Sequence, residues 1–299
     1  MKSFFAIEDV FDMDDYFSEL DKIKVNRNGN TISLHKPLLL LLTISEIRNG
    51  HQNQFIYDDL EMNLKNLLSK YGLRNTSTYN PQYPFVYLAS SHKLWVCSID
   101  KYTLKSPDSA TRKEVLGSTG AFTNEFYSFM KQNDHATKLI QKILKEYWTE
   151  SYHEDILRDI GAFDMNNNEL NLVAKRSRSF VEEIMDAYER KCAICNQSIR
   201  LADTLIGIDA CHLKPIQHFG EDHVTNGIAL CKTHHWALDR GAISINLERR
   251  VVVSSKMNGI KMGDYFTKYE DVEIHLPRKK EVWILDKNIN YHSNFIFIK

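Results

Sequence analysis

Between residues 13 and 160, apolar residues recur mostly at intervals of three and four positions, the spacing of one face of an α-helix. Pro37 is tolerated in a first helical turn, and the pairs Asn49-Gly50 and Tyr71-Gly72 are helix ends. We therefore predict helices over residues 13–23, 37–48 and 58–71, then two or three over 123–160, broken near 133–134 and ended by Gly161.

Two apolar runs differ from this pattern. Residues 83–90 and 94–99 are rich in aromatic and β-branched side chains, which predicts a hairpin and makes the N-terminal region mainly helical with a small sheet. The densest apolar run, residues 37–44, is much shorter than the roughly 20 residues that cross a bilayer. We expect a soluble, cytoplasmic protein.

The helical pattern stops after Gly161. We predict a first domain over residues 1–161, a linker over 162–177 and a second domain over 178–299. The second domain is expected to begin with a helix over 178–190, to contain a hairpin of 243–245 with 251–253, and to pack its last forty residues back on itself.

Composition adds one local feature to these predictions, a cluster of cysteines and histidines in the second domain. The formal net charge is only -1, so binding to nucleic acid would need local basic patches. Four of the five cysteines lie with several histidines between residues 192 and 240. Cys192 and Cys195 have C-x2-C spacing, Cys231 and His234 have C-x2-H spacing, and two such pairs are typical of a structural zinc site. The alternative is unrelated buried cysteines.

Polar groups of hydrolase type remain when these ligands are set aside. His212, Asn226, His235 and Asp239 occur in DACHLKP, TNGIALC and HHWALDRG. Phosphodiester hydrolysis needs a general base and a cation that stabilises charge on the phosphate. The segment resembles an HNH, or ββα-metal, nuclease domain of the zinc-containing McrA-like kind.

The resemblance implies a role for each of these residues. His212 would be the general base, and Asn226 would brace the base and the loop of residues 213–225. His235 would hold a catalytic divalent metal such as Mg2+ or Mn2+. Asp239, four residues later on the same helix face, would be a ligand or would orient His235.

One position departs from the Asp-His form of this motif, because Cys211 precedes His212. A hard cation does not favour a thiolate, so another oxygen ligand is needed. Asp209 shares the strand face of Cys211 and is the candidate. Basic neighbours that could contact phosphates, or could be ordinary surface charges, are Lys214, His218, His223, Lys232 and Arg240.

The N-terminal pieces SLHKPLLLLL and PQYPFVYLASSHKLW resemble the sulfur-binding domain of phosphorothioate-dependent type IV restriction enzymes. A non-bridging sulfur keeps the phosphate charge but is larger and less hydrated than oxygen, so its reader needs apolar surface beside a cation. The resemblance implies Tyr83 and Pro84 for the apolar surface and His35 and Lys36 for its rim. Arg112 and Lys113 are possible groove contacts. Alternatively, these residues only begin a core helix and a strand.

The sequence therefore predicts an α+β protein with a mainly helical N-terminal domain, a small sheet, and a C-terminal HNH domain with a structural zinc knuckle. The expected function is cleavage of phosphorothioated double-stranded DNA by a homodimer, since one HNH site cuts one strand. The alternatives are an HNH nuclease that reads methylated DNA, another modification or a specific sequence, and a zinc module that binds DNA without cutting it.

Overall fold

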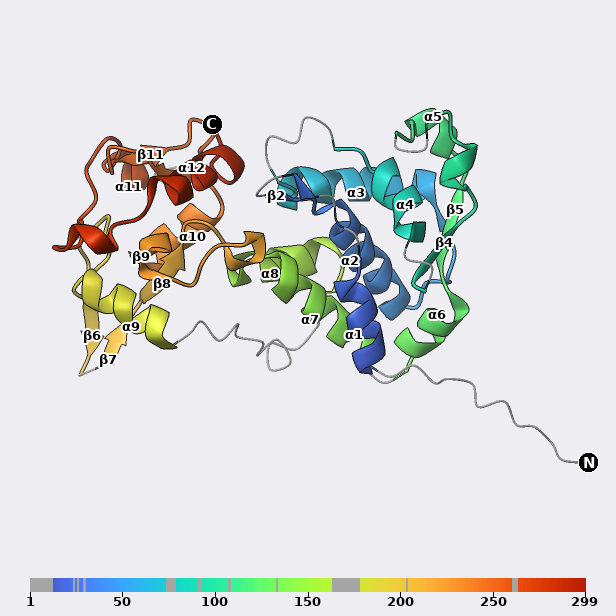
Figure 1. The fold of residues 1–299 in the computed structure, drawn as a ribbon, viewed down its shortest axis with the longest axis horizontal. Helices are drawn as coiled ribbons and strands as arrows, with labels where there is room; N and C mark the ends of the chain where they lie inside the picture. The colour runs from blue at the N-terminus through green and yellow to red at the C-terminus, as the bar shows by residue number, and fades with distance from the viewer. Residues whose placement is uncertain are drawn as a thin grey trace, which may run out of the picture.

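The chain folds into two lobes, each with its own hydrophobic core (Figure 1). The computed structural model describes residues 13–162 and 178–299, except 24, 26, 29–30, 74–78, 91–92, 107–108, 133, 203 and 260–262. The first core is built from residues between Tyr16 and Ala162, and the second from residues between Phe180 and Ile289. The predicted linker over 162–177 lies almost entirely outside the described residues.

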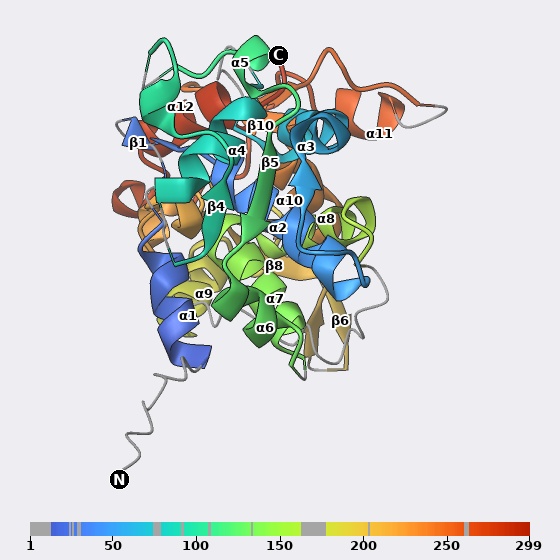
Figure 2. The ribbon, with the colours of Figure 1, turned by 90° about the vertical axis from the view of Figure 1, so that its right-hand side faces the viewer.

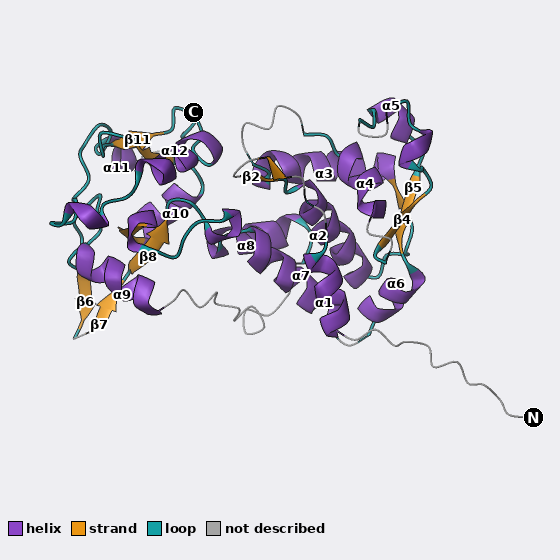
Figure 3. Cartoon of the chain, in the orientation of Figure 1, coloured by secondary structure: helices purple, strands orange, loops and turns teal. Residues whose placement is uncertain are grey.

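The N-terminal lobe is mainly helical, as predicted (Figure 3). Its helices and strands are α1 (Met13–Asp21), β1 (Arg27–Asn28), β2 (Thr31–Ile32), α2 (His35–Arg48), β3 (Phe55–Ile56), α3 (Tyr57–Tyr71), α4 (Gln82–Tyr87), β4 (Trp95–Cys97), α5 (Arg112–Val115), β5 (Thr119–Phe122), α6 (Asn124–Met130), α7 (His135–Tyr147) and α8 (Glu150–Asp159). The helices predicted over 13–23, 37–48, 58–71 and 123–160 are confirmed.

Helix α2 is the centre of this lobe. Its residues from Pro37 to Ser45 are all buried, so the helix has no solvent-facing stripe. A helix that is apolar all round belongs inside a core, and α2 packs against α3, α4, α6 and α7. The other helices therefore take their positions from α2.

The hairpin predicted for residues 83–99 is wrong. Gln82–Tyr87 is helix α4, and only Trp95–Cys97 forms a strand. Pro84 lies in the first turn of α4, where its missing N–H costs little, and the following Phe85 and Val86 are buried. Short apolar runs do not distinguish a buried helix from a strand. The sheet has the order β3-β5-β4, with antiparallel pairing, and faces the viewer in Figure 2.

The C-terminal lobe contains a ββα unit. Strands β8 (Ile208–His212) and β9 (Gly227–Cys231) pair antiparallel and lead into helix α10 (Lys232–Asp239). The other helices and strands of this lobe are α9 (Arg178–Ala187), β6 (Ile199–Leu201), β7 (Thr204–Ile206), β10 (Ile243–Ile245), β11 (Val251–Val253), α11 (Gly263–Thr267) and α12 (Asp286–Phe295).

The remaining predictions for this lobe agree with the structure. A helix occupies 178–187, and β10 and β11 form the predicted hairpin. The last forty residues pack back on the lobe, since Ile284, Ile289 and Tyr291 are buried and the Leu285 amide donates to the carbonyl of Thr225. None of the described helices has the length and apolar character needed to cross a membrane.

Gly120 allows the sheet to approach the aromatic core of the N-terminal lobe. A Cβ at this position would overlap the buried ring of Trp95 and would touch Phe85. We expect Gly120→Ala to lower the free energy of unfolding of this lobe by about 1–3 kcal/mol, the usual cost of overpacking. A denaturant titration measures this, with Ala121→Ser on the half-exposed strand face as the control. An unchanged midpoint for Gly120→Ala would contradict this packing.

Candidate active site

The ββα unit brings Asp209 and His235 together. Asp209 lies on β8, on the strand face that it shares with Cys211, and its Oδ2 is 2.9 Å from His235 Nδ1 on α10. Its Oδ1 accepts a bond from Lys232 Nζ at 2.8 Å. Burial raises the pKa of Asp209, but the hydrogen bonds from His235 and Lys232 lower it more, to about 2. Asp209 is therefore a carboxylate at neutral pH.

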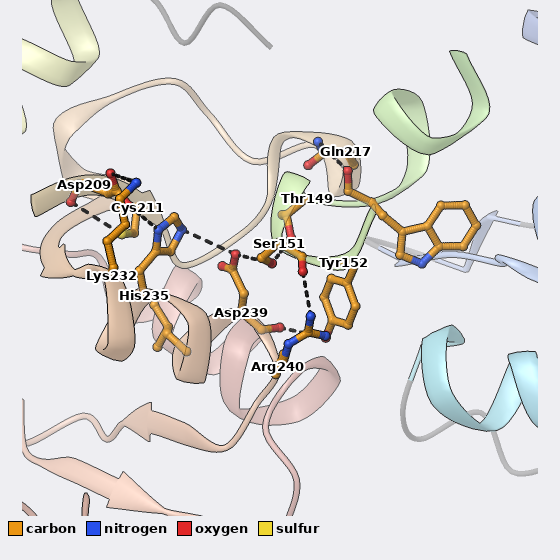
Figure 4. A network of polar contacts seen from close by, with 12 residues as sticks. Thr149, Ser151, Tyr152, Asp209, Cys211, Gln217, Lys232, His235, Asp239 and Arg240 are labelled. Carbon is orange, nitrogen blue, oxygen red and sulfur yellow. Dashed lines mark hydrogen bonds and ion pairs between the residues drawn. The ribbon is translucent and has the colours of Figure 1, made fainter. Parts of the chain in front are cut away.

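Asp239 lies on the other side of the same ring. One turn after His235 on α10, its Oδ2 is 3.4 Å from His235 Nε2 (Figure 4). Burial lowers the pKa of His235, but Cys211, Asp209 and Asp239 raise it well above its usual range. The two carboxylates thus face opposite ring nitrogens. A cation bound at one nitrogen of His235 would have one of the two carboxylates beside it, and the other carboxylate would orient the ring, a role that the sequence left open for Asp239.

His212 is the last residue of β8. Its ring stacks on Phe180 of α9, with centroids 4.1 Å apart and an interplanar angle of 3°. Its Nε2 lies 3.0 Å from Asp222 Oδ1. The sequence gives no signal for Phe180 or Asp222, because an aromatic residue on a helix and an acid in a long loop belong to no motif. Together they fix the orientation of the imidazole.

Asn226 holds the loop that follows His212. Its side chain is fully buried, accepts from the amide of Lys214 at 3.0 Å, and donates to the carbonyls of Lys214 and Glu221, each at 2.9 Å. These bonds join the two ends of the loop. Asp222 is therefore carried toward His212 by a loop whose ends are fixed.

A cleft of about 1040 Å³ separates the two lobes at this point. His212, Asp222, His235 and Asp239 lie along it. Its other wall belongs to the N-terminal lobe and includes Phe17, Lys138, Lys142, Lys145 and Tyr147. The candidate catalytic residues therefore face the first lobe across the cleft.

Helix α8 of the N-terminal lobe contacts the end of α10 directly (Figure 4). Ser151 Oγ donates to Asp239 Oδ2 at 2.7 Å, and Tyr152 Oη donates to the Asp239 carbonyl at 2.8 Å. Arg240 forms an ion pair with Asp155 at 2.5 Å, and its guanidinium lies 4.7 Å from the Tyr152 ring centroid. The sequence gives no signal for these contacts, because they join two lobes through ordinary helix-surface residues.

Cys192, Cys195, Cys231 and His234 form a compact cluster. Their ligand atoms all lie within 4.8 Å of one another, and the residues are buried or half-buried. His234 Nδ1 is the ring nitrogen that faces the sulfurs, at 3.1 Å from Cys231 and 3.5 Å from Cys192. The cluster could hold a metal ion, and it joins the segment after α9 to the start of α10.

Three of the basic neighbours already have partners or are neutral. Lys232 binds Asp209 and Arg240 binds Asp155. His218 is buried, and its burial together with the positive charge of Lys214 lowers its pKa to about 4. It is therefore uncharged at neutral pH, which argues against a role in binding phosphates.

The candidate residues for DNA binding in the first lobe lie on α2 and α4, which pack together. Lys36 Nζ is 3.3 Å from Ser90 Oγ, just beyond α4, and His35 Nδ1 is 2.9 Å from Ser33 Oγ. Tyr83 is half-buried on α4, and Pro84 is buried. The fold thus brings two sequence segments that lie far apart into contact at the start of α2.

Arg112 and Lys113 begin α5. The Arg112 guanidinium makes a two-pronged ion pair with Glu61 of α3, with N–O distances of 2.5 and 2.7 Å. Lys113 is exposed. A phosphate that approached Arg112 would compete with this carboxylate, so Lys113 is the more accessible of the two.

Two solved sulfur-binding domains are similar to part of this chain. That of SprMcrA, complexed with phosphorothioated DNA, has 18% identity, covers 52% of this chain and 98% of that chain, and gives a TM-score of 0.44. That of ScoMcrA, also with phosphorothioated DNA, has 19% identity, the same coverages and a TM-score of 0.43. The modification-dependent TagI restriction endonuclease has 22% identity over 39% of this chain and 37% of that chain, with a TM-score of 0.30.

No curated protein matches the chain. Two family models do. The model of the ScoMcrA-like DNA sulfur-binding domain matches residues 13–164, which is about half of the chain, and the model of the HNH endonuclease matches residues 192–246. The second match includes the cysteine cluster, the ββα unit and the polar residues around His235. The chain belongs to the ScoMcrA-like sulfur-binding family and joins that domain to an HNH endonuclease domain.

Proposed function

We propose that this protein is a restriction endonuclease that recognises phosphorothioated double-stranded DNA and hydrolyses a phosphodiester bond nearby. Residues 1–161 would read the modification, residues 178–299 would cut, and 162–177 would link them. The observation that carries the proposal is the presence of both family matches in one chain whose His212 and His235 open onto the cleft between the lobes.

The reading site is proposed where α2 meets α4. A phosphorothioate sulfur is less hydrated than oxygen, so contact with the half-buried ring of Tyr83 and with Pro84 favours it. The phosphate charge remains, and Lys36 and His35 supply the polar rim. The exposed Lys36 ammonium beside Ser90 supports this arrangement. Because Lys binds as a point charge, this rim lacks the two-pronged contact that Arg would give.

His212 is proposed as the general base. A neutral histidine that donates from Nε2 to Asp222 has its lone pair on Nδ1, which would take the proton from the attacking water. The stacked ring of Phe180 limits the tilt of the imidazole. Asn226 keeps the loop closed so that Asp222 stays at the base.

His235 and Asp239 are proposed to hold the catalytic divalent cation, since both line the cleft. An ionised carboxylate and an imidazole suit Mg2+ or Mn2+ better than the Cys211 thiol does. When bound, the cation stabilises the charge that develops on the phosphate and on the leaving 3′ oxygen. Asp209 would bind His235 at Nδ1 and orient the ring, as carboxylates commonly do beside metal-bound histidines.

The cluster of Cys192, Cys195, Cys231 and His234 is proposed as a structural zinc site. Three sulfurs and one imidazole nitrogen within 4.8 Å suit a four-coordinate zinc with no open position for chemistry. A homodimer is also proposed, because a double-strand break needs two active sites.

Removal of the zinc should unfold the C-terminal lobe selectively. We expect Cys192→Ser to lose zinc and the cooperative unfolding transition of this lobe, because metal binding and folding are coupled in small metal-stabilised units. Zinc content by mass spectrometry and thermal unfolding measure both effects. Cys97→Ser, a half-buried cysteine outside the cluster, is the matched control. A Cys192→Ser protein with one zinc per chain would refute the assignment.

Loss of the general base should abolish cutting without abolishing binding. We expect His212→Ala to lower kcat on phosphorothioated duplex by about 10²–10⁴, the usual contribution of general acid–base catalysis. DNA binding and zinc content should be unchanged. His275→Ala, an exposed histidine of the same lobe, serves as the control. Wild-type cutting by His212→Ala would remove this residue from the mechanism.

Loss of the sulfur contact should remove discrimination. We expect Tyr83→Ala to raise the Kd for phosphorothioated duplex by about tenfold, since the apolar surface of this half-buried ring that the sulfur covers contributes about 25 cal/mol per Å². The Kd for unmodified duplex should change little. Binding titrations of both duplexes measure this, with the 74% exposed Tyr102 changed to alanine as the control. Equal cutting of both duplexes by the wild type would instead favour another modification or a specific sequence.

A further inference from the structure

The sulfur-binding lobe reaches into the nuclease site through the first turn of α8. Ser151 Oγ is 2.7 Å from Asp239 Oδ2, and Thr149 Oγ1 is 3.1 Å from Ser151 Oγ (Figure 4). The Asp239 side chain is only 6% exposed. A buried carboxylate needs hydrogen-bond donors to offset its lost hydration, and here one donor belongs to the other lobe.

The geometry at Asp239 Oδ2 is specific. The Ser151 hydroxyl and the His235 ring approach the same carboxylate oxygen, at 2.7 and 3.4 Å. The hydroxyl thereby limits the rotation of the Asp239 side chain and fixes its distance from His235. A partner that orients a metal-binding side chain in this way commonly affects metal affinity or activity by about 10–100-fold.

The neighbouring contacts join the lobes without touching this carboxylate. Tyr152 Oη binds the Asp239 main-chain carbonyl, and the Arg240 guanidinium binds Asp155 and the Ser151 carbonyl. The interface therefore contains two kinds of hydrogen bond to the same residue, one to its side chain and one to its backbone. Docking of the lobes and positioning of the carboxylate can be tested separately.

We propose that Ser151 is a positioning residue of the nuclease site, acting through Asp239 on His235 and on the cation that they hold. This inference rests on the proposed function and adds to it that the sulfur-binding lobe supplies part of the nuclease site. The nuclease is then complete only while α8 is docked on α10. Any movement of the first lobe on its DNA would change the site through Ser151.

The test compares three variants of the full chain: Ser151→Ala, Ser151→Thr and Tyr152→Phe. Ser151→Ala and Tyr152→Phe each remove one hydrogen bond from α8 to Asp239. We expect Ser151→Ala to raise the Mn2+ dissociation constant, measured by electron paramagnetic resonance without DNA, by about tenfold. It should also lower kcat on phosphorothioated duplex with little change in KM. Ser151→Thr keeps the hydroxyl, so its Mn2+ dissociation constant and kcat should be close to those of the wild type. For Tyr152→Phe, both quantities should stay within about twofold of wild type.

Several outcomes would overturn the inference. If Ser151→Ala binds Mn2+ as the wild type does, or if Tyr152→Phe has the same effect as Ser151→Ala, the contact serves only to dock the lobes. If the wild type binds no Mn2+ and cuts no duplex while its zinc and fold are intact, the proposed function fails and takes this inference with it. A wild type that cuts, beside a Ser151→Ala variant that cuts equally well, refutes the role of Ser151 alone. Thermal unfolding shows whether each variant is folded.

Discussion

The candidate active site depends on how α10 is fixed at both of its ends. An isolated helix of eight residues is too short to be stable in water. The cysteine cluster holds its first turn through Cys231 and His234, and α8 holds its last turn through Asp239 and Arg240. His235, between these two anchors, therefore lies at a defined place against β8.

Helix α2 of the first lobe likewise has contacts at both of its ends. It carries His35 and Lys36 at its start, and Ser45 Oγ near its end donates to the carbonyl of Ile160, just after α8, at 2.8 Å. Asn49 adds a bond to the carbonyl of Gly161. A 14-residue helix is about 21 Å long. One buried helix thus extends from the proposed reading site to the helix that contacts the nuclease.

The sequence could predict the elements whose signal is local. The apolar periodicity of α3 and α7, and the paired spacing of Cys192, Cys195, Cys231 and His234, depend only on neighbouring residues. The helix over Gln82–Tyr87 could not be told from a strand, because a short run of apolar and aromatic residues fits either form. Its helical form depends on burial beneath Trp95, whose Nε1 donates to the Phe85 carbonyl.

The residues that complete the site were beyond prediction for a different reason. Asp222 meets His212 only because Asn226 closes the loop between them, and Ser151 meets Asp239 only because the two lobes dock. Such contacts depend on the relative position of segments that are distant in the sequence. Neither the periodicity nor the residue spacing within one segment predicts where it lies relative to the other.

Cys211 explains why Asp209 and Asp239 both matter in the proposed site. Where the motif commonly has Asp before its histidine, this chain has a buried thiol, so the strand offers no carboxylate at that position. Asp209, two residues earlier, binds His235 from the Nδ1 side and is neutralised in part by Lys232. The carboxylate that faces the cleft is then Asp239 on the helix, which lies within reach of α8. In the proposed site the oxygen ligand of the cation would therefore lie on the helix instead of the strand, and the nuclease would depend on contact with the first lobe.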